Sequence, residues 1–143
     1  NLIAIAASKT DEVFSQFPDT TVIGGDTIVV FKDEILQKPK DEEDAKAMLE
    51  KLSGQTHEVW TAVSMKSSLH QEDFIVKAKV MFYEISEEEI NKYIASGEPM
   101  DKAGSYNIDG YGALFIKEVT GDYFAVMGLP VARVYQTLKN NTW

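Results

Sequence analysis

Residues 97–112 read GEPMDKAGSYNIDGYG, and this stretch carries more information about the chain than any other. It contains four glycines, two aspartates, one glutamate, one lysine and two tyrosines. Glycines at this density indicate a backbone that turns sharply or lies very close to another group. Charged and aromatic side chains on such a loop are typical of a segment that faces a ligand. We therefore take residues 97–112, called the glycine-rich loop below, as the first candidate for a functional site.

The sequence on both sides of the glycine-rich loop predicts helices. Ser86 to Glu89 forms a capping box, and Gly97 stops the helix that follows it. Asp41 is placed to cap a second helix, which Gly54 ends in a left-handed conformation. A weaker helical pattern begins the chain without a visible cap, and Pro130 suits the first turn of a last helix. The expected helices span residues 2–17, 41–52, 86–95 and a segment after Pro130.

Alternating apolar and polar residues predict strands between these helices. A polar tip at residues 67–71 indicates a hairpin, and Thr120-Gly121-Asp122 indicates a tight turn between two further strands. The expected strands span residues 20–31, 58–66, 74–85, 113–119 and 123–126. This order of elements predicts one α/β domain over residues 1–143, with a mixed, twisted sheet and flanking helices.

Composition narrows the class of protein. The chain has 143 residues, 44% of them apolar, which is enough for one domain with a substantial core. Its net charge of −9 argues against broad contact with a nucleic acid polymer or an anionic membrane. No apolar run is long enough to cross a membrane. The absence of cysteine excludes disulfides and thiolate metal sites and fits a reducing cytoplasm. Because the chain starts at Asn1, without Met or a secretion signal, we interpret it as a fragment.

Three polar groups outside the loop are candidates for chemistry. Asp26 interrupts an apolar strand, where it pairs with a cation, binds a metal or lies at an open strand edge, or else serves in a turn or bulge. Lys38 lies between an apolar segment and a rigid proline, and on its own it is more typical of a solvated loop. His57 could act as an acid, a base or a ligand, although a lone histidine at a strand start is more often structural.

The glycine-rich loop adds two carboxylates and one ammonium group within five residues, at Glu98, Asp101 and Lys102. Such a set can bind a metal and a phosphate together, and backbone N–H groups of the glycines can face an anion. The loop is not a Walker motif, and no G-x-G-x-x-G fingerprint follows a strand. The chain also lacks the G-x-S-x-G elbow of serine hydrolases.

Five blocks of sequence, taken together, resemble the Maf family of nucleoside triphosphate pyrophosphatases related to septum-formation inhibitors. The resemblance runs from about Lys9 to about Leu138, which is nearly the whole chain. The blocks are GGDT at 24–27, KP at 38–39, LSGxxHxVxTAV at 52–63, EPxDKAGxYxIxGxGALF at 98–115 and GDYxxVxGLP at 121–130.

The resemblance implies a fold, a reaction and roles for particular residues. The fold is the elongated, two-lobed Maf/inosine-triphosphatase-like fold with a central cleft, often as a homodimer. The reaction is Mg²⁺- or Mn²⁺-dependent hydrolysis of dTTP or UTP, or of modified pyrimidine nucleotides, to the monophosphate and pyrophosphate. Asp26 is implied as a metal ligand or as the base that activates water, and Glu98 as a second metal ligand. The residues implied at the substrate are Lys9, Thr27, Lys38, Glu98, Asp101, Lys102 and Asp109.

The sequence departs from the family pattern in two places. The family's phosphate loop, S-x-S-P-R-R, belongs upstream of Lys9, so we expect this chain to lack that loop and to be inactive or nearly so as written. In the base-reading block Asp109 stands where the pyrimidine branch has Gln, and Gln37 precedes Lys38 where glycine is frequent. A carboxylate cannot supply the amide donor, so the reaction type is better specified by the sequence than the base preference.

Two other functions fit parts of the sequence. A nucleotide-binding regulator of cell division and septum formation would use the same cleft without significant turnover, and would not need Asp26 for chemistry. An inert α/β domain would leave Asp26, Lys38 and Glu98 scattered and solvated.

Overall fold

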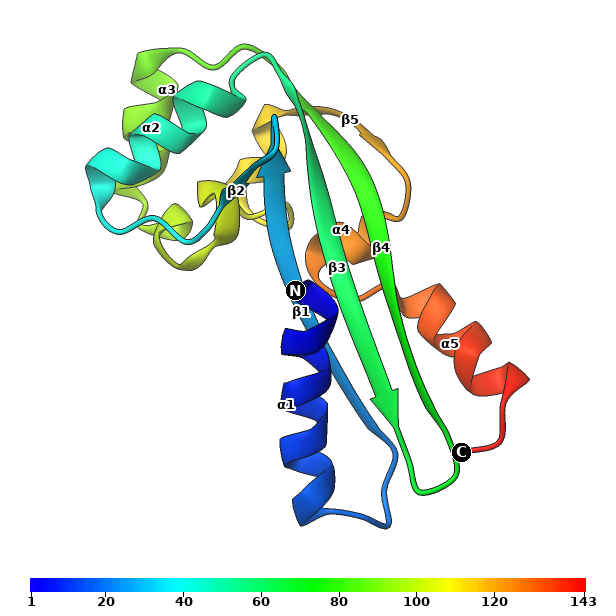
Figure 1. The fold of residues 1–143 in the computed structure, drawn as a ribbon. Helices are drawn as coiled ribbons and strands as arrows, with labels where there is room; N and C mark the ends of the chain where they lie inside the picture. The colour runs from blue at the N-terminus through cyan, green and yellow to red at the C-terminus, as the bar shows by residue number, and fades with distance from the viewer.

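A single antiparallel sheet organises the protein, and the computed structural model describes all of residues 1–143. Its five strands lie in the order β2-β1-β3-β4-β5, and helices flank both faces (Figure 1). The α/β class with flanking helices is confirmed. Every strand pair is antiparallel, so the expectation of a mixed sheet is wrong. The strands are β1 (Val22–Phe31), β2 (Glu34–Leu36), β3 (Thr56–Lys66), β4 (Gln71–Phe82) and β5 (Ile116–Thr120).

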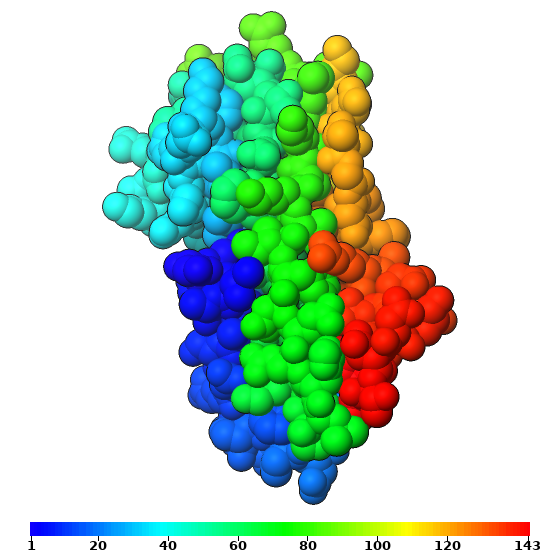
Figure 2. All heavy atoms as spheres, turned by 45° about the vertical axis from the view of Figure 1, so that its right-hand side comes forward, coloured from blue at the N-terminus to red at the C-terminus, as the bar shows by residue number.

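The long β3–β4 hairpin gives the molecule its elongated shape (Figure 1). Its two strands stay paired from Thr56 opposite Met81 to Lys66 opposite Gln71. The hairpin tip is closed by a backbone bond of 2.8 Å from the Ser67 N–H to the His70 carbonyl, as the polar tip predicted. In Figure 2 the surface of β4 runs between α1 on one side and α5 on the other.

The helices divide the molecule into two ends. The upper end in Figure 1 holds α2, α3 and the glycine-rich loop, which pack with β1, β3 and β4 into the largest apolar cluster. At the lower end α1 packs on one sheet face around Ala62, and α5 packs on the other around Val63 and Met65. The helices are α1 (Leu2–Gln16), α2 (Glu42–Leu52), α3 (Glu87–Ala95), α4 (Tyr123–Met127) and α5 (Val131–Asn140).

Side-chain caps fix where the helices begin. The Asp41 carboxylate accepts from the Asp44 N–H at the start of α2, and Ser86 and Glu89 form the expected capping box of α3. Gly97 follows α3 with a φ of 78°, a left-handed conformation that glycine adopts at little cost. Helix α1 also has a cap, since the Asn1 side chain accepts from the Ile3 N–H at 2.9 Å. The sequence pattern had not predicted that cap.

One predicted strand is a helix. Residues 123–126 lie in α4, because the Asp122 carboxylate accepts from the Phe124 and Ala125 N–H groups and so caps a helical turn. The preceding strand is also shorter than expected. Residues 113–115 belong to the 3-10 helix η3 (Tyr111–Phe115), and β5 begins only at Ile116. The glycine-rich loop forms two further short 3-10 helices, η1 (Glu98–Asp101) and η2 (Ala103–Ser105).

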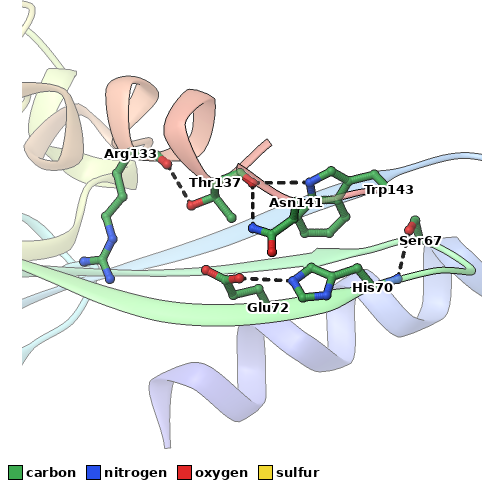
Figure 3. A network of polar contacts seen from close by, with 7 residues as sticks. All are labelled: Ser67, His70, Glu72, Arg133, Thr137, Asn141 and Trp143. Atoms are coloured by element: carbon green, nitrogen blue, oxygen red, sulfur yellow. Dashed lines mark hydrogen bonds and ion pairs between the residues drawn. The ribbon is translucent and has the colours of Figure 1, made fainter. Parts of the chain in front are cut away.

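The C-terminal residue Trp143 contacts the tip of the β3–β4 hairpin (Figure 3). The Trp143 indole N–H donates to the Thr137 carbonyl at 3.3 Å, and the Trp143 ring meets the His70 ring edge-on at 4.7 Å between centroids. His70 in turn lies 3.1 Å from a Glu72 carboxylate oxygen. These contacts hold α5 against the hairpin and involve none of the predicted site residues.

Candidate active site

Two adjoining cavities form a cleft beside β1, one on each face of the sheet. We call them the loop pocket and the helix pocket, with volumes of about 200 and 670 Å³. They share three lining residues, Thr27, Lys38 and Ala103. The loop pocket is bounded by the glycine-rich loop and α4, and it is also lined by Val29, Val59, Asp101, Lys102, Tyr106, Asn107, Ile108, Val126, Met127 and Gly128. The helix pocket is also lined by Asn1, Leu2, Ile5, Asp26, Ile28, Ile35, Leu36, Gln37, Trp60 and Ile75.

The cleft is open because β1 lacks a partner along part of its outer edge. Strand β2 pairs only with Val29, Val30 and Phe31, so no strand neighbours the preceding residues on that side. Asp26 lies on this unpaired edge and its side chain is 27% exposed. The placement agrees with the expectation of an aspartate at an open strand edge, and it gives the carboxylate access to a ligand.

Lys9 reaches Asp26 from α1 and forms an ion pair with it at 3.1 Å. The close approach of α1 to β1 depends on Gly24, where an added Cβ would lie 2.4 Å from the Thr10 hydroxyl oxygen. The Lys9 side chain is 56% exposed, so the pair contributes about 1 kcal/mol or less to stability. Its importance is therefore positional, because it places a cation next to a carboxylate that lines the helix pocket.

Lys38 is brought to the junction of the two pockets by the glycine-rich loop. The Gly104 N–H donates to the Gln37 carbonyl at 3.3 Å, which ties the segment after β2 to the loop. Gly104 has a φ of 71°, and an added Cβ there would lie 2.9 Å from a Val29 methyl carbon. A residue with a side chain would push the loop away from β1. Lys38 thus lines the same cleft as Asp26, and its role at the substrate stays a prediction.

Glu98 begins η1 within the glycine-rich loop and lines neither pocket. Its carboxylate accepts from the Tyr93 hydroxyl and from the N–H groups of Tyr111 and Gly112, at 3.0 and 3.1 Å for the two amides. Burial alone would raise the pKa of Glu98, but these hydrogen bonds and the charge of Lys102 together lower it. The metal-ligand role of Glu98 stays a prediction, and the geometry favours a role in ordering the loop.

Tyr93 connects Glu98 to the residues that form the wall of the loop pocket. Its hydroxyl donates to Glu98 and accepts from the Asn107 N–H at 3.0 Å. Burial, and then the hydrogen bond to Glu98, raise the pKa of Tyr93 well above its ordinary value, so the hydroxyl keeps its proton. Asn107 and Ile108 line the loop pocket, so Tyr93 and Glu98 support that wall from outside.

His57 is a core residue. It is 2% exposed, its Nε2 lies 2.7 Å from the Tyr106 hydroxyl oxygen, and its ring meets Phe82 edge-on at 5.0 Å. Burial lowers the pKa of His57 to about 4, so the ring is neutral at pH 7. Tyr106, but not His57, lines the loop pocket. The structural interpretation of this histidine agrees with its place in the fold.

The remaining predicted residues divide between the cleft and the surface. Asp101 and Lys102 line the loop pocket, next to the shared Lys38. Asp109 is exposed in a turn and lines neither pocket, so its link to base preference stays a prediction. The loop pocket is also lined by Asn107, Met127 and Gly128, which had not been predicted as site residues. The glycine of the Gly-Leu-Pro block could have indicated a sharp turn here. In the structure Gly128 has a φ of 123°, which glycine adopts far more readily than other residues.

The carboxylates of the cleft fit a metal that arrives with its substrate. No group of three or more His, Cys, Asp or Glu residues is close enough to hold a metal by itself. Mg²⁺ commonly takes one or two protein carboxylates and completes its shell with water and substrate phosphates. Asp26 is partly exposed and lines the helix pocket, so one carboxylate is available there to such an ion. The donor set therefore fits a divalent metal shared with a polyphosphate.

The amino-acid sequence matches one protein family over nearly its whole length. The chain belongs to the Maf-like family, whose sequence model, described as "Maf-like protein", matches residues 1–141. It is 50% identical over 139 residues to a "dTTP/UTP pyrophosphatase" of Geobacillus sp. (strain WCH70), covering 97% of this chain and 75% of that relative. It is 47% identical over 138 residues to a protein of the same name from Bacillus cytotoxicus, covering 96% of this chain and 72% of the relative. None of the helices of this chain is both long enough and apolar enough to span a bilayer.

Proposed function

We propose that the protein is a nucleoside triphosphate pyrophosphatase that hydrolyses dTTP and UTP, or modified pyrimidine nucleotides, to the monophosphate and pyrophosphate. One observation carries the proposal: Lys9 and Asp26 form a cation–carboxylate pair at a cleft that also contains Lys38. Relatives up to 50% identical carry the name dTTP/UTP pyrophosphatase, which supports the same reaction here.

The two pockets suit different parts of such a substrate. The loop pocket combines apolar residues that include Val29, Val59 and Ile108 with several polar and charged side chains, and this combination suits a base or sugar site. The helix pocket places Asp26 beside Lys9, which suits a triphosphate and its metal. Lys38 lines both pockets, so a nucleotide that spans them would have its phosphates next to this ammonium group.

Asp26 is the group that we assign to proton transfer. Water attacks the α-phosphorus, the bond from that phosphorus to the oxygen bridging to the β-phosphorus breaks, and pyrophosphate leaves. The Asp26 carboxylate accepts the proton that the water loses. Lys9 and Lys38 stabilise the negative charge on the phosphate oxygens as it develops. A divalent ion bound at Asp26 would lower the pKa of water and neutralise phosphate charge.

The identity of the ion, the assembly and the location are further parts of the proposal. Mg²⁺ or Mn²⁺ fits oxygen ligands of this kind better than a thiolate-seeking metal. Resemblance to the family supports a homodimer, and the absence of cysteine supports a cytoplasmic location.

A nucleotide-binding regulator of cell division and septum formation is the second candidate. The same cleft favours it, because binding needs Lys38 and the loop pocket but not proton transfer by Asp26. The two candidates differ in turnover and in their dependence on the Asp26 carboxylate.

The reaction and its base preference are tested together by product analysis. The complete protein is incubated with UTP, dTTP, CTP, ATP and GTP with Mg²⁺ or Mn²⁺, and pyrophosphate and orthophosphate are measured separately. We expect pyrophosphate and the monophosphate from UTP and dTTP at the highest rates. Release of orthophosphate instead would contradict the reaction, and equal rates on purine and pyrimidine triphosphates would contradict the base preference.

A further inference from the structure

A chain of hydroxyl groups joins the loop pocket to helix α4. Thr27 on β1 is the register partner of Thr61 on β3, and their hydroxyl oxygens lie 3.0 Å apart. The Thr61 hydroxyl oxygen also lies 2.7 Å from the carbonyl oxygen of Ala125. Thr61 is fully buried, whereas Thr27 is partly exposed and lines both pockets.

The Ala125 carbonyl group, at the end of this series of hydrogen bonds, determines which hydroxyl donates to which. A carbonyl oxygen only accepts, so the single Thr61 proton must go to Ala125. Without that proton two acceptor oxygens would face each other at 2.7 Å in a buried site, which is costly. With its own proton committed, Thr61 can only accept from Thr27. The contact between the two threonines is therefore a hydrogen bond from Thr27 to Thr61.

This direction determines what Thr27 presents to a ligand. Its one hydroxyl proton points at Thr61, so only lone pairs of Thr27 are left for the cleft. A ligand atom bonded to Thr27 must then be a donor. The pyrimidine bases differ at N3, because uracil and thymine carry an imide N3–H there, whereas N3 of cytosine is an acceptor and only its exocyclic 4-amino group donates.

We propose that Thr61 is a positioning residue that holds Thr27 as an obligate acceptor and so selects nucleotides with an imide N–H. The inference rests on the proposed function, because it takes the loop pocket as the base site. Thr61 itself lines neither pocket and acts through Thr27, which lines both. A site built to accept one hydrogen bond discriminates strongly against an analogue that offers an acceptor in its place.

Two substitutions separate selection from simple packing. Thr61→Val keeps the shape of the side chain but removes the hydroxyl, which leaves Thr27 free to rotate and donate. Thr61→Ser keeps the hydroxyl and is the matched control. If Thr61 only held α4 against the sheet, loss of its hydroxyl would slow the hydrolysis of all nucleotides by the same factor.

The test is the ratio of kcat/KM for UTP to that for CTP, measured with the complete protein and both variants. We expect Thr61→Val to lower this ratio about 10-fold, and Thr61→Ser to keep it within about 3-fold of the original. An unchanged ratio in Thr61→Val, with both substrates slowed equally, would overturn the proposal. If Thr61→Val does not fold, Thr27→Val replaces it, because it removes the acceptor itself and should lower the ratio as well.

Calorimetric binding of UMP and CMP distinguishes this inference from the proposed function. Absence of hydrolysis in the unsubstituted protein would refute the pyrophosphatase reaction but not the proton direction. UMP should then still bind about 10-fold more tightly than CMP, and the preference should disappear in Thr61→Val. Equal binding of UMP and CMP by the unsubstituted protein would overturn the role of Thr61.

Discussion

The Lys9 ammonium nitrogen lies 3.1 Å from an Asp26 carboxylate oxygen, and this pair joins α1 to the unpaired edge of β1. The two residues are 17 positions apart in sequence, and Gly24 lets the helix approach the strand that closely. Since most of β1 lies at the sheet edge, the pair faces the cleft and not a neighbouring strand.

Replacing Lys9 should affect catalysis far more than stability. We expect Lys9→Gln to lower kcat/KM for UTP about 100-fold, because a cation next to the reacting phosphate is lost. Its unfolding free energy should fall by about 1 kcal/mol or less, since the pair is exposed. Lys66→Gln is the matched control, because Lys66 forms a similar 2.9 Å ion pair between β3 and Asp11 of α1, and Asp11 lines neither pocket whereas Asp26 lines the helix pocket. Equal loss of activity in both variants would contradict a role for Lys9 in the site.

Replacing Glu98 tests whether it binds metal or orders the loop. In Glu98→Gln an amide NH2 group replaces one of the two carboxylate oxygens that accept from the N–H groups of Tyr111 and Gly112. A donor then faces a donor, and one hydrogen bond is lost. We expect a loss of about 1–3 kcal/mol of stability and lower activity, with an unchanged Mg²⁺ concentration at half-maximal rate. Tyr93→Phe should reproduce the effect in milder form, and exposed Glu88→Gln should have none. A shift of the Mg²⁺ requirement in Glu98→Gln alone would restore the metal-ligand interpretation.

Buried His57 should make the fold sensitive to acid. Its pKa is about 4 in the folded protein and 6.5 when unperturbed, so below pH 6.5 the unfolded chain takes up the proton first. Stability then falls as the pH falls from 6.5 to 4, by about 3 kcal/mol in total, and this contribution levels off below pH 4. Denaturant unfolding at several pH values measures it. His57→Gln cannot titrate and should have a flatter profile over this range, whereas an equal slope would contradict the assignment.

Much of the fold could be predicted because local signals agreed with the final structure. Ser86 and Glu89 form the capping box that the spacing indicated, and Gly54 has the expected left-handed φ, at 67°. The β3–β4 hairpin has the expected tip. Asp26 and Lys38 could be singled out because each is a charged residue held in a constrained apolar setting.

What could not be predicted depended on contacts between distant segments or on very short elements. Residues 123–126 are too few for alternation to distinguish a strand from a helical turn, and the Asp122 cap decided the outcome. The position of Glu98 depended on Tyr93 and on two amides across the loop. The role proposed for Thr61 needed the pairing of β1 with β3 and the approach of Ala125.

Pyrophosphate release from UTP by the complete protein and by its Asp26→Asn variant tests the central claim most directly. Asparagine keeps the size of the side chain but cannot accept the proton from water. We predict that turnover falls at least about 100-fold, while nucleotide affinity changes less than about 10-fold. Turnover that survives in Asp26→Asn, or a complete protein that binds UTP without releasing pyrophosphate, would contradict the account.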